Sequence, residues 1–427
     1  MTRAFRLLMY GLILASAAAQ FALVPVMPVY AHRLGLSGLQ QGLLLGATGL
    51  ATLAVSVPAG TLADRFGARR ITLAAGLLMA AATLGQALAG SFPALLAARL
   101  AFGAGYGVLW TAGLCWLAAA AGGPRALGGS VASAGVGGVV GPAVSGALTE
   151  HLGLAVPLLA AAAGFAVITA ALAALRVPAG TAGSGPAALA GLRAAGRDRG
   201  VIGAAAAVVT AGLSTGACAL LVPAQLHLTG ASSGQIGLVF AAAGILFAAG
   251  SALTTAAGRR AVTLPVICAG MLVLTAALSL GVLSTASLAL IVMLCVATAA
   301  RSVLWTVSYP LAATAAERRG IGLGAAVGLL NGIWAATAVL GPLGAGLAAE
   351  HLGGRAAFGL TEAACAAALA VTVAATGRGR LPARLLTGLS RLAACRVTGR
   401  GWLAARRAAG HGPGPDPVPA SRGTAVP

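Results

Sequence analysis

The sequence predicts an all-α membrane protein with twelve transmembrane helices in two parallel six-helix bundles. Its 427 residues are 59% hydrophobic and only 8% charged, with a mean hydropathy of +0.96, which is too apolar for a soluble protein. Apolar runs of about twenty residues, the length that crosses a bilayer as a helix, recur along the chain. The second half of the chain also repeats residues of the first half at constant spacing.

The first apolar run covers residues 7–31 and follows Arg3 and Arg6, so the start of the chain resembles a secretory signal. The run continues through residue 30 without a polar break, which makes it longer than the apolar core of such a signal. We therefore expect an uncleaved first transmembrane helix.

Five further apolar runs complete a first set: residues 40–63, 71–90, 94–120, 126–150 and 155–175. Six more form a second set: residues 201–225, 234–257, 261–283, 287–316, 322–350 and 356–376. The chain is thus predicted to contain an N-terminal bundle, a cytoplasmic linker, a C-terminal bundle and a basic, partly disordered cytoplasmic tail: residues 1–176, 177–200, 201–376 and 377–427. Part of the tail could instead lie on the membrane as an amphipathic helix.

The two sets of runs share residues at two fixed offsets. Residues recur 195 positions later, among them Pro28, His32, Ser37 and Gln40 as Pro223, His227, Ser232 and Gln235. Others recur 200 positions later, among them Gly141, Pro142, Gly146, Glu150 and His151 as Gly341, Pro342, Gly346, Glu350 and His351. Parallel six-helix halves of this kind place a central site between two bundles.

The arginines predict the orientation of the chain. All 27 basic residues are arginine, and those outside the runs fall on one side of the membrane, except for Arg33 and Arg355. The positive-inside rule then places both termini in the cytoplasm of a multi-pass protein of the cell membrane. The net charge of +20 matches an anionic membrane face, and no basic face interleaved with aromatic residues indicates nucleic acid.

A short charged segment, residues 60–70, lies between the second and third runs and has the sequence Gly-Thr-Leu-Ala-Asp-Arg-Phe-Gly-Ala-Arg-Arg. It resembles the major facilitator superfamily, whose loop between helices 2 and 3 carries Gly-x-Leu-Ala-Asp-Arg-x-Gly-x-Arg-Arg. The matching residues are Gly60, Leu62, Ala63, Asp64, Arg65, Gly67, Arg69 and Arg70. The resemblance implies the major facilitator fold and a gating motif at the cytoplasmic face.

In the resembled family this aspartate lies near the cytoplasmic N-terminus of helix 11, where backbone N–H groups present positive charge. We therefore interpret Asp64 as a gating residue, with topology enforcement by the arginines as the alternative. The equivalent segment of the second half has Thr255 where Asp64 would fall, so we expect an asymmetric gate.

In the fourth run, Arg99, Gly103 and Gly105 resemble the Arg-x-x-x-Gly-x-Gly motif of the same superfamily. Tyr106 and Trp110 follow at helical spacing, which places a cation and two aromatic residues along one stripe. An arginine at membrane depth needs a water-filled cavity or a partner. Snorkelling to the outer surface is the alternative.

The fifth run resembles the glycine motif of the drug/proton antiporter branch, the exporters, Gly-x8-Gly-x3-Gly-Pro-x2-Gly-Gly. The matching residues are Gly128, Gly137, Gly141, Pro142 and Gly146, and Ser145 replaces one glycine. Small residues every fourth position let a neighbouring backbone approach closely. The resemblance implies export, and simple helix packing is the alternative.

Several polar and aromatic residues in the spans are candidates for a substrate or proton pathway: Tyr106, Trp110, Arg301, Trp305, Asn331, Trp334 and Glu362. Ionisable groups inside a membrane are functional candidates by default. Glu362 is the only acid deep within a run, and we expect it to carry the coupling proton. A structural Arg301–Glu362 ion pair is the alternative.

The resemblance covers residues 7–376. It implies a secondary active transporter that exports a small molecule by alternating access, in exchange for protons. The resemblance to the drug/proton antiporter branch also implies a role in efflux and multidrug resistance. A proton-coupled importer of sugars or other metabolites is the alternative. A membrane-embedded enzyme fits poorly because the acids and histidines are scattered, and a transport-dead sensor is a further rival.

The expected partners are a small-molecule substrate, protons and the lipid bilayer. We expect no cofactor and no metal, and the chain has neither a lysine nor a Gly-x4-Gly-Lys motif for ATP. We expect a monomer, although the sequence leaves the oligomeric state open. The first run contains no acid, so a neutral or anionic substrate fits Arg99 and Arg301 better than a cation.

Overall fold

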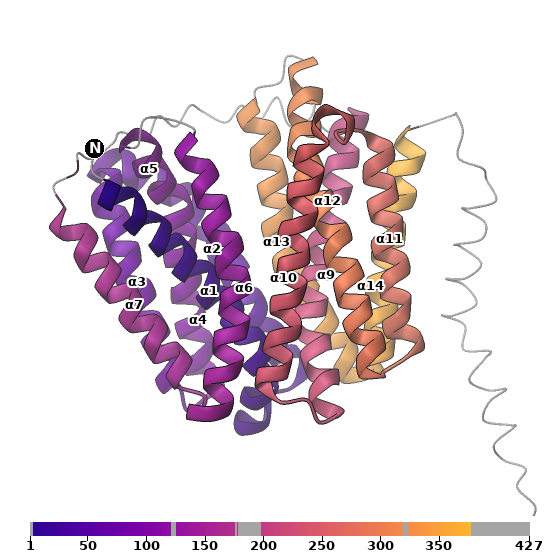
Figure 1. The fold of residues 1–427 in the computed structure, drawn as a ribbon, viewed down its shortest axis with the longest axis horizontal. Coiled ribbons are helices and arrows are strands. Elements are labelled where there is room, and N and C mark those ends of the chain that lie inside the picture. Colours follow the sequence, from indigo (N-terminus) through magenta and orange to yellow (C-terminus); the bar gives the residue numbers. More distant parts are fainter. Residues whose placement is uncertain (1–2, 121–124, 176, 178–197, 319–322, 377–427) are drawn as a thin grey trace, which may run out of the picture. The chain divides into compact units, whose positions relative to one another are not determined.

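The computed structural model describes residues 3–120, 125–175, 177, 198–318 and 323–376 (Figure 1). Within these residues all the regular elements are helices, and twelve spans are long and apolar enough to cross a membrane. The predicted fold class is thereby confirmed. The described residues form one compact unit. The predicted tail and most of the predicted linker lie outside the described residues, and the division into two bundles at residues 176 and 200 stays a prediction.

The first half contributes six spans, of which the fourth consists of three consecutive elements. The bounds are α1 (Arg3–Leu34), α2 (Gly38–Phe66), α3 (Ala68–Leu88), α4 (Phe92–Val108) with η1 (Leu109–Gly113) and α5 (Leu114–Ala120), α6 (Arg125–Leu152) and α7 (Val156–Ala174). The second half contributes α9 (Arg199–Leu228), α10 (Ser233–Ala256), the short η2 (Gly258–Arg260), α11 (Leu264–Leu283), α12 (Ser287–Arg318), α13 (Leu323–Leu352) and α14 (Gly354–Thr376).

The fourth span differs from the continuous α-helix expected over residues 94–120. Residues Leu109–Gly113 form a π-helical segment instead. The Thr111 hydroxyl donates a hydrogen bond to the Gly107 carbonyl oxygen at 2.9 Å, and that carbonyl is the one an α-helix would pair with the Thr111 N–H. Single π-turns of this kind are frequent at functional sites, and this one carries Trp110.

The repeat is visible in how equivalent helices begin. Ser37 and Ser232 each cap their helix through the side chain and form a capping box with the glutamine three residues later, Gln40 and Gln235. A capping box satisfies two of the backbone N–H groups that a helix leaves unpaired at its start. The same local sequence therefore starts α2 and α10 at equivalent places.

Helix packing joins elements within each half and across the two halves. In the first half α1 packs on α6, and α3 packs on α4 and α7, while α2 packs on α4. In the second half α9 packs on α12, α13 and α14, and α11 packs on α12 and α14. The halves meet where α2 packs on α13 and α6 packs on α10, an arrangement that can be followed in Figure 1.

The antiparallel succession of spans gives the compact unit two chemically different ends. We call one the histidine end, because α1, α6, α9 and α13 bring His32, His151, His227 and His351 there, all exposed. We call the other the arginine end, because it carries Arg65, Arg69, Arg70, Arg259, Arg260 and Arg318. The exposed hydrophobic side chains that remain along the spans are what lipid tails would cover.

Candidate functional site

Helix α6 packs against the backbone of α1 along a ladder of three small residues. A Cβ on Gly137 would lie 2.9 Å from the Ala17 Cβ, and a Cβ on Gly141 would lie 2.7 Å from the Ala18 Cα. One turn further, the Ser145 hydroxyl donates to the Ala22 carbonyl oxygen at 2.7 Å. The serine that departs from the family's glycine motif thus bonds to the backbone that the two glycines approach. Gly128 lies where the structure gives no side-chain surroundings.

An adjacent face of α6, formed by the residues that directly follow Gly141 and Ser145, approaches α10 across the boundary between the halves. A Cβ on Gly237 would overlap the Pro142 carbonyl oxygen, and a Cβ on Gly146 would overlap the Ser233 carbonyl oxygen. Gly141, Pro142 and Gly146 therefore hold α6 between a helix of its own half and a helix of the other half. Close backbone contact of this kind needs small residues on the facing surfaces.

The related contact between α2 and α13 repeats this geometry. A Cβ on Gly42 would lie 2.5 Å from the Pro342 carbonyl oxygen, and a Cβ on Gly38 would overlap the Gly346 carbonyl oxygen. Gly42 and Pro342 are the repeat equivalents of Gly237 and Pro142. Both crossings lie toward the histidine end of their helices, so the halves are in backbone contact there.

The charged segment at residues 60–70 forms the turn between α2 and α3 at the arginine end. Gly67 has a φ of +87°, a conformation that favours glycine, and it separates the two helices. Arg69 reaches across to α7, where its Nη2 donates to the carbonyl oxygens of Ala173 at 2.8 Å and Leu175 at 3.2 Å. The arginine thereby satisfies carbonyl groups at the C-terminus of α7.

The other residues of this turn lie toward the surface. Asp64 and Arg70 are exposed, Leu62 is exposed, and the Arg65 guanidinium lies 5.2 Å from the Phe66 ring centroid. A Cβ on Gly60 would meet open space. The predicted partner of Asp64 is the N-terminus of the eleventh span, α13, which begins at Leu323 directly after residues that lie outside the described part of the chain. No contact of Asp64 with that N-terminus is described, so the gating contact stays a prediction.

Arg99 on α4 is buried, with 1% of its surface exposed. Its Nη2 donates to the backbone carbonyl oxygen of Gln20 at 2.9 Å and to the Gln20 side-chain oxygen at 3.1 Å. The ring centroid of Phe102 lies 5.2 Å from the guanidinium carbon. Arg99 therefore has a partner inside the bundle, which is one of the alternatives that the sequence leaves open. The other alternative, snorkelling to the outer surface, is wrong.

The two glycines of the same motif let α4 fit between its neighbours. A Cβ on Gly103 would lie 2.7 Å from the Thr48 Cα of α2, and a Cβ on Gly105 would lie 2.7 Å from the Met79 side chain of α3. The Thr52 hydroxyl of α2 donates to the Gly103 carbonyl oxygen at 3.2 Å. These close contacts of the two glycines therefore set the position and rotation of α4 that bring the Arg99 side chain to Gln20.

An aromatic group follows Arg99 along the fourth span. The ring centroids of Tyr106 and Trp110 are 6.0 Å apart, and those of Phe102 and Tyr106 are 6.2 Å apart. Tyr106 and Trp110 are both partly exposed. The π-helical segment begins at Leu109, directly before Trp110, so the irregular backbone of the fourth span lies at the aromatic group.

The second half carries a larger group, which we call the aromatic patch: Trp305, Tyr309, Asn331 and Trp334. Trp305 stacks on Tyr309 with centroids 5.7 Å apart, and the Trp305 and Trp334 centroids are 6.4 Å apart. The Tyr309 hydroxyl donates to the Asn331 side-chain oxygen at 2.8 Å. The patch is partly exposed and rests on buried aliphatic side chains of α9, α12 and α13. It offers flat apolar faces beside an amide, as ligand sites commonly do.

Arg301 and Glu362 make their hydrogen bonds outside this patch. Arg301 is buried and donates to the Thr298 hydroxyl one turn earlier on α12. Glu362 on α14 accepts a hydrogen bond from the Ser279 hydroxyl of α11 at 2.6 Å, and it is only partly buried. Glu362 therefore lies at the α11–α14 contact, while the patch lies on α12 and α13.

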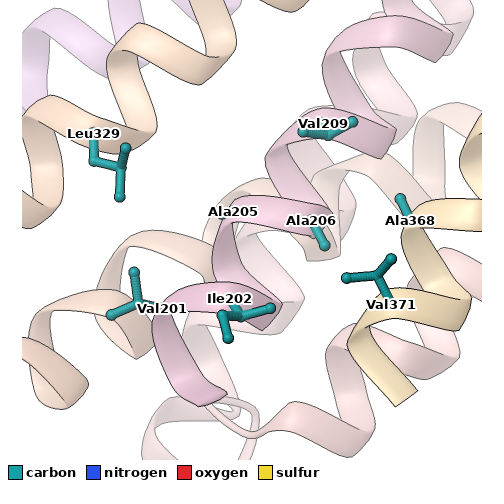
Figure 2. A pocket seen from close by; sticks show the side chains of 8 residues that line it. All are labelled: Val201, Ile202, Ala205, Ala206, Val209, Leu329, Ala368 and Val371. Carbon is teal, nitrogen blue, oxygen red and sulfur yellow. The ribbon is translucent and has the colours of Figure 1, made fainter. Parts of the chain in front are cut away.

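Pockets among the described residues differ in chemical character. A pocket of about 300 Å³ between α9, α13 and α14 is lined only by aliphatic side chains, such as Val201, Ala205, Leu329 and Val371 (Figure 2). Nothing in that lining could orient a polar substrate. A pocket of about 1000 Å³ at the arginine end is lined by Asp198, Arg199, Thr314 and Arg318 among others, so polar groups gather at that end instead.

Sequence reasoning missed the role of two acids at the histidine end, Glu150 and Glu350. Each accepts backbone hydrogen bonds from the start of a helix in the other half. The signal that could have found them is the recurrence of Glu-His-Leu-Gly at the two helix ends and of Ser-x-x-Gln at the two helix starts that they meet.

Comparisons with known proteins agree with this architecture. A sequence profile of the Major Facilitator Superfamily matches residues 9–326. A solved bacterial homologue of the human lysosomal transporter Spinster, in an inward-facing and unoccupied conformation, has a TM-score of 0.72 and 17% identity, with 88% of this chain and 98% of that chain covered. The nucleoside transporter NupG has a TM-score of 0.70 and 12% identity, with coverage of 88% and 100%.

A comparison with curated protein sequences gives no match. The two solved structures are similar to this chain in fold, and both are transporters and not enzymes. Because the family profile spans most of the chain and the fold agrees with it, the chain belongs to the Major Facilitator Superfamily of small-molecule transporters.

Proposed function

We propose that this transporter exports a small molecule across the cytoplasmic membrane by alternating access, in exchange for protons. The observation that carries the proposal is the contact of α6 with α1 through Gly137, Gly141 and Ser145. The resembled exporters have small residues at these positions of the fifth helix. Here all three make the close backbone contact for which small residues are needed.

The position of α6 gives this contact a mechanical role. Its glycine ladder joins it to α1 in the first half, while Pro142 and Gly146 face α10 in the second half. Rocking of one half against the other changes the second contact and leaves the first in place. We infer that α6 moves with α1 as one rigid pair.

The aromatic patch is our candidate for the substrate surface. Stacked Trp305 and Tyr309, with Trp334 beside them, provide flat apolar faces, and Asn331 provides hydrogen bonding. The flat aromatic faces favour a planar or apolar substrate. Arg99 and Arg301 donate only to neutral groups of their own halves, Gln20 and Thr298, so they do not exclude an anionic group on it.

We infer that the arginine end faces the cytoplasm, because cytoplasmic loops carry the excess of arginine in membrane proteins. Reporter fusions made after Gly200 and after Gly410 are expected to report the cytoplasm in both cases. A fusion inside the Leu34–Gly38 turn at the histidine end should report the outside and serves as the control. A cytoplasmic signal from that turn, or an external signal from either of the other fusions, would contradict the orientation.

The function itself is tested by substrate accumulation in cells. A panel of antibiotics, dyes and sugars is offered to cells with and without the gene, and to cells that carry Trp334→Ala as a matched variant of the aromatic patch. Export predicts that at least one compound accumulates less when the wild-type protein is present, and that Trp334→Ala restores its accumulation. Greater accumulation of a compound in cells with the protein would instead establish import.

A further inference from the structure

Two glutamates join the halves at the histidine end. Glu150 lies at the end of α6, and its Oε2 accepts a hydrogen bond from the Ser232 hydroxyl at 2.8 Å and from the Gly234 N–H at 3.0 Å. Both donors lie at the start of α10, in the other half of the protein: Ser232 is its N-cap residue and Gly234 is in its first turn. One carboxylate oxygen therefore links the end of α6 to the start of α10.

Glu350 makes the equivalent contact on the other side of the repeat. It lies at the end of α13, and its Oε2 accepts a hydrogen bond from the Leu39 N–H of α2 at 3.0 Å. Leu39 follows the capping residue Ser37 by two positions, as Gly234 follows Ser232. The two carboxylates thus bind the same position of two repeat-related helices.

A carboxylate suits this position for two physical reasons. The first N–H groups of a helix have no partner within the helix, and the helix dipole places partial positive charge there. Hydrogen bonds to an ionised acceptor are also stronger than bonds between neutral groups. Each glutamate therefore attracts the start of a helix that moves with the opposite half.

The backbones of the paired helices touch directly beside each glutamate, so the glutamate hydrogen bonds must break when the halves separate at this end. Below Glu150, Gly146 contacts Ser233 and Pro142 contacts Gly237; below Glu350, the equivalent pairs are Gly346 with Gly38 and Pro342 with Gly42. The carboxylates lie at the outer end of each crossing, beyond these glycines. Opening of the histidine end must therefore separate both carboxylates from their N–H donors.

We propose that Glu150 and Glu350 act as a pair of latches, which hold the histidine end closed and set how often it opens during transport. The proposal rests on alternating access as the mode of transport, but it concerns the balance between conformations and not the substrate. Neither glutamate needs to touch the substrate, so both are positioning residues for the conformational step.

The size of the effect follows from charge at a helix start. Removing one such charge changes an equilibrium by about fivefold at an exposed site, so the two substitutions together are expected to shift it by about 25-fold. Glu150→Gln and Glu350→Gln should have similar single effects, because the two sites are related by the repeat. The amides keep the size of the side chains and lose only the charge.

The test measures the distance across the histidine end by pulsed electron spin resonance. Spin labels are placed at His32→Cys and His227→Cys in the full-length protein, after its six native cysteines have been replaced and transport has been verified. Both positions are exposed and lie at the ends of α1 and α9, one in each half. The wild type should give mainly one short distance, and the double Glu→Gln variant should show the longer-distance population raised by about 25-fold relative to the short one.

Glu317→Gln serves as the matched control, since this exposed glutamate of α12 lies at the arginine end. It should leave the distance distribution across the histidine end unchanged. Gly42→Ala provides a second route to opening, because its Cβ would meet the Pro342 carbonyl oxygen at 2.5 Å without altering either carboxylate.

Unchanged distances in the double Glu→Gln variant, in a preparation where Gly42→Ala does lengthen them, would overturn the latch and leave the glutamates as helix caps. An equal shift with Glu317→Gln would overturn it as well. Because the distances are measured without substrate, a failure of the export proposal would leave this result interpretable.

Discussion

Gly141→Leu is expected to lower the ratio of folded to unfolded protein by about a hundredfold, and with it the yield of protein that transports. The glycine lies against the α1 backbone, where its Cβ would already be 2.7 Å from the Ala18 Cα. Overpacking a tight contact costs about 1–3 kcal/mol, and a leucine against a backbone carbonyl belongs at the upper end of that range. The α1–α6 contact is also the one that keeps the proposed rigid pair together.

Gly135→Leu is the matched control for this substitution. Gly135 lies on the same helix, but a Cβ there would meet no atom within 4 Å. It should fold and transport as the wild type does, measured by monodisperse yield in detergent and by substrate flux in the cell assay. Near-normal folding and flux of Gly141→Leu would show that α1 and α6 tolerate separation, and the rigid-pair account would then be wrong.

Glu362→Gln is expected to abolish transport driven by a pH gradient while leaving substrate exchange without a gradient intact. Proton exchange needs a group that can take up and release a proton as access changes, and a carboxyl can do so whereas arginine stays charged. The amide oxygen of glutamine can still accept the Ser279 hydroxyl bond, which is 2.6 Å long here. The α11–α14 contact should therefore survive the substitution.

Ser279→Ala separates the chemistry of the proton from the packing of the two helices. It removes the hydrogen bond and keeps the carboxyl, so gradient-driven transport should persist in proteoliposomes. If Ser279→Ala abolished coupling as completely as Glu362→Gln, the hydrogen bond would be the essential feature. If Glu362→Gln stayed fully coupled, the proton carrier would have to be sought at Asp64.

Much of the fold could be predicted from the sequence because hydrocarbon thickness fixes the length of a span. The run predicted at residues 71–90 corresponds to α3 (Ala68–Leu88), and the run at 261–283 to α11 (Leu264–Leu283). The π-helical segment at Leu109–Gly113 could not be predicted, since it depends on which carbonyl oxygen accepts the hydrogen bond of the Thr111 hydroxyl. Hydropathy contains no information on that choice.

The site was predicted only as far as single residues can indicate it. The sequence identifies Arg99 as an intramembrane cation, but its partner depends on the rotation of α4 against α1, and the glycines that set this rotation contact α2 and α3. Trp305 and Trp334 were recognised separately, and their contact depends on how α12 meets α13. Glu150 and Glu350 show the limit most clearly, because their donors lie 84 and 311 residues away in the chain.

The measurement that tests proton-coupled export most directly is the pH inside proteoliposomes that contain the purified wild-type protein. With the substrate identified in the cell assay, addition of substrate on one side should move protons in the opposite direction, in step with substrate flux, and an imposed pH gradient should drive substrate toward the acidic side. Proton movement in the same direction as the substrate, or substrate flux with no proton movement at all, would contradict the account.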